Sequence, residues 1–283
     1  MAKNRKHVNW SKFYTNFINR NIGLVSVLEQ EKIRDTTVAI FGVGGLGGPL
    51  AENLVRSGCE HIIICDHGKF EESNLNRQLC FREDIGKQKI DVTEEILKKI
   101  NPDIEVCKSL EVNEDNISIM LKHVSIAVLT LDDPVTSIYI ARKCLEAKIP
   151  LLESWGIPYL WAWWFTYESI DYETCYKFNT KKLSISEIRN SEDIIIDMKI
   201  KILDKLQKFP EVRKRYDREK GTVKGLLSGK LPLVSFAPVV RMTASYLAFE
   251  VIFSGIIKAK KMILAPKVLG YDYINMNPLI LEL

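Results

Sequence analysis

Residues 42–48 read GVGGLGG, and they lie between the apolar run VAIF at 38–41 and the segment PLAENLVRSG at 49–58. An apolar run that ends in a glycine turn is typical of a strand buried on both faces. Gly42, Gly44 and Gly47 match G-x-G-x-x-G between this strand and a predicted helix. Because glycine lets a backbone turn tightly and approach phosphate oxygens, the stretch predicts a nucleotide site. A dinucleotide and ATP both remain open.

Apolar runs and helical patterns alternate through the first half of the chain. Further strands are predicted at 61–66, 104–110, 125–131 and 149–157, with helices between them. Such alternation gives a parallel sheet with helices on both faces. We therefore predict an α/β fold with a doubly wound, mainly parallel but mixed sheet, whose first half is a Rossmann-like nucleotide-binding unit. Ligands are expected at the carboxyl ends of its strands.

The second half has a different pattern. A strand at 159–168 carries Trp161, Trp163 and Trp164, which we expect in the core or in a dimer interface, with an aromatic substrate floor as the alternative. Residues 183–222 are charged and helical in pattern, a strongly apolar helix starts near Pro238, and two strands close the chain. Because no linker rich in Gly, Ser or Pro is present, residues 37–283 are predicted to form one domain after a helical lead-in at 1–36.

Composition and cysteine usage narrow the class of protein. Of the 283 residues, 46% are hydrophobic and 27% charged, which is ordinary for a globular chain. We expect no membrane association, because no apolar run approaches the ~20 residues that span a bilayer. The N-terminus lacks the apolar core of a secretory signal. The six cysteines are scattered without a CxxC pair, so we expect a cytoplasmic protein with no cysteine-built zinc site.

The loop that follows the second strand separates the two kinds of nucleotide. Asp66 ends that strand, where a carboxylate can accept hydrogen bonds from ribose hydroxyls. Beyond it, polar and basic side chains are dense: Asn74, Asn76, Arg77, Gln78, Lys87 and Lys89. A dinucleotide needs no such cluster, whereas a triphosphate does, because arginine offers a planar fork and lysine a point charge to phosphate oxygens. This loop therefore favours ATP.

Two adjacent carboxylates follow the fourth strand. Asp132 and Asp133 stand at the same sheet edge as the glycine turn, where a carboxylate can hold magnesium against the phosphates of ATP. Asp133 immediately precedes Pro134, so it could equally cap the next helix. Sequence reasoning leaves both roles open.

The segments GVGGLGG, CDHGKFEESNLNRQ, DIGKQK and LDDP together resemble the ThiF/MoeB family of adenylating enzymes, relatives of the ubiquitin-activating enzymes. The likeness extends from the lead-in to the late apolar helix. It implies ATP and magnesium as cofactors and the attack of a carboxylate on the α-phosphate, which gives an acyl-adenylate and pyrophosphate. The residues it assigns to the nucleotide are Gly42, Gly44, Gly45, Gly47, Asp66, Asn74, Asn76, Arg77, Gln78 and Lys89, with Asp133 organising the magnesium ion.

The resemblance also implies how the molecules assemble. Arg20 matches a lead-in arginine that reaches the ATP bound by the partner subunit, so a homodimer is expected. Residues 158–283 would form the substrate-binding half, beside a nucleotide-binding half at 37–157. A crossover loop at about 175–232 would guide a substrate tail, and its surplus of Lys and Arg suits an acidic peptide and RNA almost equally.

The chain departs from many members of the family in its cysteines. It lacks their two zinc-binding CxxC pairs, and the candidate for a thioester-forming cysteine is Cys175, which we expect to be structural. The activated carboxylate would then pass to another nucleophile, as in members that tailor antibiotic peptides or dehydrate a tRNA base. We expect a peptide or small-protein substrate. Sulfur-carrier activation, tRNA dehydration, an NAD- or FAD-dependent oxidoreductase and a non-catalytic scaffold are the alternatives.

Overall fold

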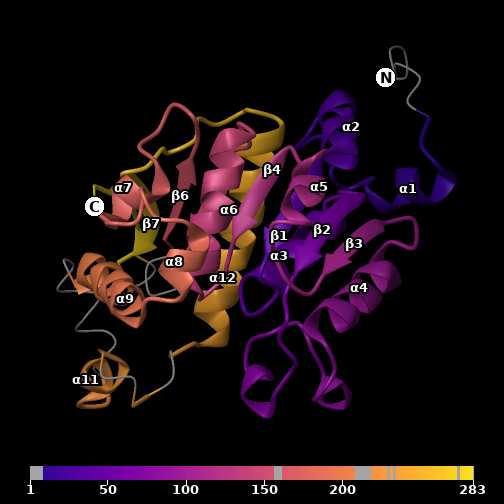
Figure 1. Cartoon of the computed structure of the whole chain (residues 1–283). Helices are drawn as coiled ribbons and strands as arrows, with labels where there is room; N and C mark the ends of the chain where they lie inside the picture. Colours follow the sequence, from indigo (N-terminus) through magenta and orange to yellow (C-terminus); the bar gives the residue numbers. More distant parts are fainter. Residues whose placement is uncertain are drawn as a thin grey trace.

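The computed structural model describes residues 9–155, 161–207, 218–227, 230–231, 234–272 and 275–282 (Figure 1). Its strands form a single sheet in the order β3-β2-β1-β4-β5-β6-β7-β8. They are β1 (Thr37–Phe41), β2 (His61–Cys65), β3 (Glu105–Ser109), β4 (Ile126–Leu129), β5 (Leu151–Ser154), β6 (Ala162–Phe165), β7 (Lys267–Asp272) and β8 (Asn277–Glu282).

The sheet is parallel in its first half and antiparallel in its second. β1 pairs in parallel with β2 and β4, and the parallel region extends to β3 and β5. From β5 onward each strand runs antiparallel to its neighbour. Strand order reverses at β1, between β2 and β4, so the carboxyl ends of these strands form the crevice where α/β proteins bind ligands. The predicted α/β fold with a mixed sheet is confirmed.

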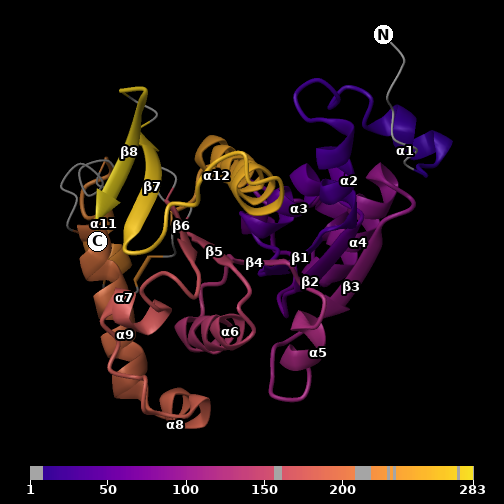
Figure 2. The same ribbon diagram turned by 90° about the horizontal axis from the view of Figure 1, so that it is seen from above.

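Helices cover both faces of the sheet (Figure 2). One face carries α2 (Val27–Asp35), α3 (Gly47–Arg56), α4 (Lys89–Ile100) and α12 (Ala237–Phe249), which continues into the π-helical η3 (Glu250–Ile256). The other carries α5 (Ile117–Leu121), α6 (Pro134–Glu146), α7 (Tyr172–Tyr176), α8 (Ile185–Arg189) and α9 (Glu192–Gln207). The other elements among the described residues are α1 (Lys12–Phe17), η1 (Glu72–Asn74), η2 (Arg82–Asp84) and α11 (Thr222–Leu227).

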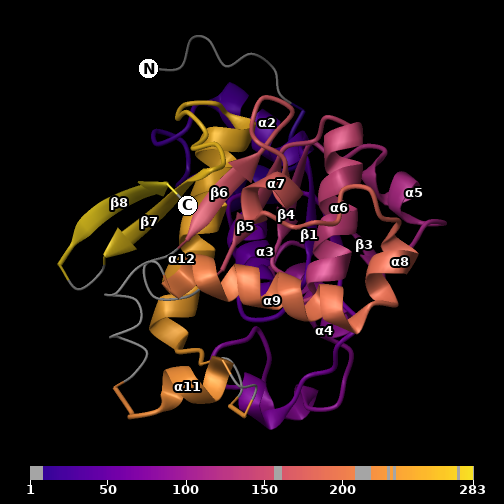
Figure 3. The ribbon, with the colours of Figure 1, turned by 60° about the vertical axis from the view of Figure 1, so that its left-hand side comes forward.

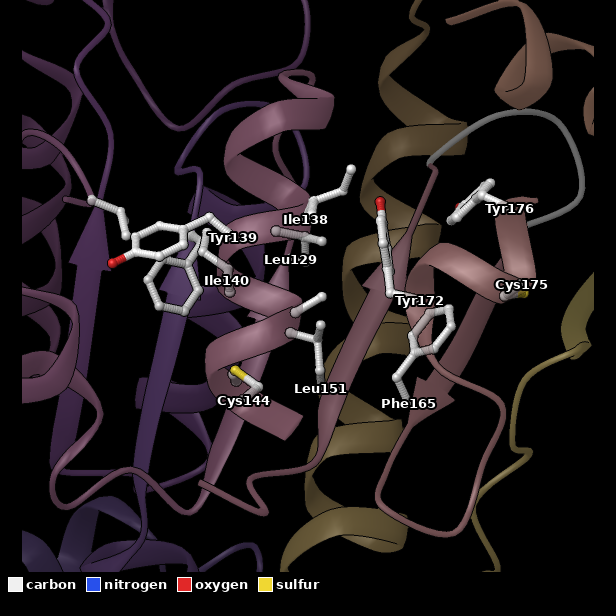
Figure 4. Close-up of a cluster of buried hydrophobic side chains, with 14 of the residues drawn as sticks. Leu129, Ile138, Tyr139, Ile140, Cys144, Leu151, Phe165, Tyr172, Cys175 and Tyr176 are labelled. Atoms are coloured by element: carbon white, nitrogen blue, oxygen red, sulfur yellow. The ribbon is translucent and has the colours of Figure 1, made fainter. Parts of the chain in front are cut away.

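Alternation along the strands divides the core into two layers. Val38 and Ile40 of β1 pack with α3 and α12, whereas Ala39 and Phe41 point to the layer of α6. All four residues of β4 are buried, which explains its uninterrupted apolar sequence. Figure 4 shows the α6 layer, where side chains of α6 and α7 meet those of β4 to β6.

The tryptophans of the second half belong to this core. Trp161 and Trp163 lie in the α6 layer and Trp164 in the α12 layer, each at most 3% exposed. Trp161 and Trp163 share one face of the sheet, as the alternation predicted. All three tryptophans are part of the core rather than an aromatic floor for a substrate. The predicted strand at 159–168 is observed as β6, and residues 156–160 lie outside the described chain.

The late apolar helix is longer than we expected from the apolar runs in the sequence. Ala237–Ile256 has the length and composition to cross a membrane, and it alone does so among the described helices. However, 56% of this window is buried inside the fold, and Leu247 and Val251 are fully enclosed in the α12 layer. It therefore serves as a core helix of the domain.

α9 lies beneath the carboxyl ends of the strands (Figure 3). Met198 and Ile202 attach it to the α6 layer, while Ile195 and Lys199, one turn apart, face the crevice. The segment between β6 and α12 thus brings side chains to the sheet edge at which β1, β2 and β4 end.

Candidate active site

The glycine turn after β1 is held by close backbone contacts. Gly42 has φ +96°, and a Cβ there would lie 2.7 Å from the carbonyl oxygen of Thr130. The Thr130 hydroxyl donates to the Gly42 carbonyl at 2.7 Å, which joins the turn to the residue that follows β4. At Gly44 the nearest atoms to a Cβ would be those of Gln78, at 3.8 Å or more, which is ordinary van der Waals contact. The turn therefore requires glycine at Gly42 for its backbone and presents a bare peptide surface at Gly44.

Asp66 ties the end of β2 to this turn. Its Oδ2 accepts a hydrogen bond from the Val43 amide at 2.9 Å, and its Oδ1 accepts one from the Gly68 amide at 2.7 Å. A carboxylate has about four acceptor positions, so two remain for hydroxyl donors. Asp66 also lines the cavity described next, in the place where a ribose carboxylate is expected.

A cavity of about 640 Å³ opens at this edge of the sheet. The predicted residues that line it are Gly42, Gly44, Gly45, Asp66, Arg77, Gln78, Lys89 and Asp133. Gly47 starts α3 just behind the turn. Asn74 is buried beneath the loop, and Asn76 is exposed and donates to the Ser235 carbonyl at 3.0 Å. Arg20 lies elsewhere. The fold therefore assembles most of the predicted set around one space.

The loop after β2 supplies cations and an unsatisfied amide. Arg77 donates to the Ser73 carbonyl and to Asn76 Oδ1, at 3.0 and 2.8 Å, which orients its guanidinium at the cavity wall. Lys89 is the first residue of α4, and its amide donates to the Gly68 carbonyl. Gln78 Oε1 is buried without a hydrogen-bond partner among the described residues. A buried acceptor of this kind costs stability unless a ligand or water satisfies it, so the wall is suited to a polar ligand.

Asp132 and Asp133 have different surroundings although they are adjacent. Asp133 is the N-cap of α6: its carboxylate accepts from the amides of Val135 and Thr136, at 3.2 and 3.1 Å, and from the Thr136 hydroxyl. Asp132 lines the same cavity, where desolvation raises the pKa of its carboxyl while the charges of Lys89 and Arg77 oppose the rise. The geometry gives the capping role to Asp133 and leaves Asp132 as the carboxylate that faces the cations.

A magnesium ion fits this arrangement through Asp132. Magnesium is held in nucleotide sites by one or two carboxylates together with phosphate oxygens and water, rather than by a protein cage. In the part of the chain that the structure describes, no group of three or more His, Cys, Asp or Glu side chains is placed to hold a metal ion.

The far wall of the cavity comes from residues that sequence reasoning missed. Glu153 belongs to β5 and Trp155 follows that strand, Ile195 and Lys199 come from α9, and Val240 comes from α12. The residues at the end of β5 could have been predicted, because ligands bind at the ends of parallel strands and β5 is parallel to β4. α9 and α12 could not be placed this way, since each reaches the edge through long-range packing.

Arg20 lies far from the cavity of its own chain. It is exposed in the turn between α1 and α2, next to Asn21, which donates to the Ser57 carbonyl at 3.1 Å. Ser57 caps the end of α3, whose first residue is at the glycine turn; ten helical residues separate the two ends by about 15 Å. In Figure 1, α1 and α2 accordingly lie at the edge opposite the loop that follows β2.

Cys175 is enclosed in the α6 layer. It is 3% exposed, and burial raises the pKa of its thiol to about 12. Because the thiolate is the nucleophilic form, this cysteine is inert in the described conformation. No cysteine is among the residues that line the cavity in the described part of the chain.

The fold and the site define a nucleotide-binding α/β protein with a polar pocket at the strand ends, lined by both basic and acidic side chains. The chain belongs to the ThiF family, whose sequence pattern matches residues 18–282. It is 32% identical over 129 residues to the tRNA threonylcarbamoyladenosine dehydratase of Bacillus subtilis, which covers 44% of this chain and 51% of that protein. The chain thus matches about half the length of that relative.

Two solved structures have the same fold. PaaA superposes with a TM-score of 0.68 at 20% identity, over 98% of this chain and 85% of its own. Escherichia coli MccB with ATP superposes with a TM-score of 0.63 at 25% identity, over 90% of this chain and 66% of its own. A further structure shows MccB, a biosynthetic enzyme of microcin C7, in complex with N-formylated MccA, at 25% identity and a TM-score of 0.62.

Proposed function

We propose that this protein is an ATP-dependent adenylyltransferase that activates a carboxylate of a peptide or small-protein substrate in a peptide-modification pathway. The observation that carries the proposal is the convergence of the glycine turn, Arg77, Lys89 and Asp132 on one cavity. The substrate carboxylate forms a bond to the α-phosphorus, and the bond to pyrophosphate breaks. Arg77 and Lys89 reduce the repulsion between carboxylate and triphosphate, and electrostatic positioning of this kind supplies most of the catalysis.

Each residue has a defined part in this proposal. Asp66 accepts the ribose hydroxyls, the peptide surface at Gly44 and Gly45 approaches the phosphates, and Gln78 Oε1 accepts a donor from the nucleotide. Asp132 would hold magnesium, which screens phosphate charge when bound. This proposal replaces the expectation that Asp133 holds the ion, because the carboxylate of Asp133 is committed to the α6 cap.

The likeness to MccB in complex with MccA supports a peptide substrate. A second candidate, dehydration of a carboxyl-bearing tRNA nucleotide, is supported by the 32% identity with the Bacillus subtilis dehydratase. Both reactions start with activation of a carboxylate by ATP, so both would use the same cavity. They differ in the substrate, a peptide or a tRNA, that would enter the cavity past α9.

A homodimer with a shared site is part of the proposal. Arg20 is too far from the cavity of its own chain to reach the nucleotide, and Met242 and Phe249 expose apolar side chains along α12. A second copy would bring its Arg20 to the phosphates and cover apolar surface. A cytoplasmic location without membrane attachment completes the proposal.

The deciding measurement is ATP–pyrophosphate exchange by the full chain with peptides, ubiquitin-like proteins or tRNA added separately. We expect exchange that depends on ATP, magnesium and a peptide. Exchange that depends on tRNA would favour the second candidate. Binding of NAD or FAD without binding of ATP would contradict both.

A further inference from the structure

Glu153 is a buried carboxylate at the carboxyl end of β5 to which the proposed adenylation step assigns no role. It is 4% exposed and lines the cavity. Its Oε1 accepts from the Tyr172 hydroxyl at 2.8 Å, and its Oε2 accepts from Trp163 Nε1 at 2.6 Å and from the Tyr176 hydroxyl at 2.7 Å. These donors are neutral. Figure 4 shows Tyr172 and Tyr176 on α7, beside the strands of the α6 layer.

The elements around Glu153 place few charges near it. Trp155 Nε1 donates to the Tyr176 hydroxyl at 2.6 Å, which links the cavity wall to the same cluster. On α7, Cys175 is buried nearby, and on α9 the Lys205 ammonium lies 5.7 Å from the centre of the Tyr176 ring. Lys199 and Asp132 line the same cavity. Glu153 therefore sits among aromatic donors at the wall of a polar cavity.

A structural clamp is the simplest role for such a carboxylate, because it joins β5, β6 and α7. Two features go beyond that role. The residue lines the cavity, which a purely structural clamp does not require. Desolvation raises the pKa of the Glu153 carboxyl to about 7, although hydrogen bonds from the surrounding Tyr and Trp side chains lower it. The group can therefore gain and lose a proton near neutral pH.

The order of the strands places Glu153 on the acyl side of the cavity. Asp66 follows β2, the glycine turn follows β1, Asp132 follows β4 and Glu153 belongs to β5; these four strands are consecutive in the sheet. Neighbouring strands are about 4.8 Å apart. A nucleotide with its ribose at Asp66 and its phosphates near Asp132 leaves the β5 side to the group joined to the α-phosphate. Glu153 is thus on the side where the second half-reaction takes place.

We propose that Glu153 accepts the proton of a nitrogen nucleophile that attacks the acyl-adenylate. This inference rests on the proposed adenylation. The nitrogen lone pair forms a C–N bond to the acyl carbon, and the C–O bond to AMP breaks with its electron pair leaving on the phosphate. The N–H bond breaks and its proton passes to the Glu153 carboxylate. The products are an amide, AMP and protonated Glu153, which returns the proton to solvent.

A nitrogen nucleophile matches this base better than an enzyme thiol. Within the described residues that line the cavity there is no cysteine, so a thioester on the enzyme has no candidate there. An amine becomes strongly acidic as its C–N bond forms, and a base that accepts protons near neutrality is matched to that step.

The first test uses the peptide that supports pyrophosphate exchange. In Glu153→Gln we expect amide formation to fall by about 10²- to 10⁴-fold, the usual contribution of a general base, while exchange falls by less than tenfold. Added hydroxylamine, which attacks an acyl-adenylate without assistance, should restore AMP release. Amide formation at the wild-type rate in Glu153→Gln would overturn the proposal.

Tyr172→Phe is the matched control, because it keeps the base and removes one donor. Loss of that donor destabilises the carboxylate anion, so the pH profile of amide formation should shift upward while the plateau rate is retained. A merely structural role predicts lower yield at every pH and no shift, and that result would also count against Glu153 as the base.

A measurement without a peptide substrate completes the design. Difference infrared spectra of wild type minus Glu153→Gln, recorded with ATP–Mg²⁺ across neutral pH, should show a single carboxyl that loses its proton near pH 7. Absence of that signal would refute the inference about Glu153. Absence of exchange with every peptide in wild type would instead refute the adenylation on which the inference rests.

Discussion

A Cβ on Gly47 would lie 1.8 Å from the carbonyl oxygen of Gly42. The first turn of α3 therefore packs directly against the backbone at the end of β1, and no side chain fits between them. This contact fixes the distance between the glycine turn and the start of the helix. The third glycine of the G-x-G-x-x-G pattern accordingly acts through packing, whereas Gly44 faces the cavity.

Gly47→Ala should destabilise the fold, and Gly44→Ala should weaken ATP binding alone. The methyl group at residue 47 would meet a backbone atom that cannot rotate away, so we expect a loss of about 1–3 kcal/mol in the free energy of unfolding. At residue 44 the nearest atoms are 3.8 Å away, so stability should change little. Urea unfolding and ATP titration calorimetry check the pair. Equal stability of Gly47→Ala and wild type would contradict the packing role.

Asp132→Ala and Asp133→Ala should have opposite effects. Loss of the Asp132 carboxylate should abolish magnesium-dependent exchange and leave the melting temperature nearly unchanged. Loss of the Asp133 cap should cost about 1 kcal/mol of stability with exchange retained within severalfold. Exchange assays and calorimetric melting of both variants decide the assignment. Loss of exchange in folded Asp133→Ala, with Asp132→Ala active, would return the magnesium role to Asp133.

Arg77→Ala should lower exchange by about 10²- to 10³-fold without unfolding the protein, because it removes a charge that faces the phosphates. Arg20→Ala should do the same if a partner subunit completes the site. A mixture of the two inactive variants should then recover about a quarter of wild-type activity, since half the dimers are hybrids with one intact site each. No recovery after subunit exchange would contradict the shared site.

Cys175→Ala should remain active. Its thiol is buried, its pKa is raised by desolvation and it is absent from the cavity wall, so the variant should lose only packing, about 1–2 kcal/mol. Product formation and urea unfolding measured together separate the two effects. Complete loss of turnover in a folded variant would restore the thioester hypothesis.

Glu153 should make stability depend on pH in an unusual direction. The pKa of its carboxyl rises from 4.5 to about 7 on folding, so between these values the folded state binds more protons than the unfolded state. The free energy of unfolding should therefore fall as pH rises through this window, by roughly 3 kcal/mol, and level off above it. Urea unfolding of wild type and Glu153→Gln at several pH values isolates this group. An unchanged difference between the two proteins across the window would contradict it.

The sequence predicted that the residues of one cavity wall lie together, because local rules were sufficient there. The glycine turn, Asp66 and the Arg77 loop all follow strands whose carboxyl ends meet at one edge. Sequence alone could not decide whether Asp132 or Asp133 would hold magnesium. A residue that precedes proline at the end of a strand can either cap the next helix or point its side chain into the site. Glu153 and Trp155 were missed because α7 and α9 create their environment through contacts distant in the chain.

The cavity takes one wall from residue 42 and another from residue 240. During synthesis on the ribosome, the glycine turn and its cations emerge long before α12 does. The cavity is therefore complete only when the glycine turn has packed together with α12, which lies near the other end of the domain.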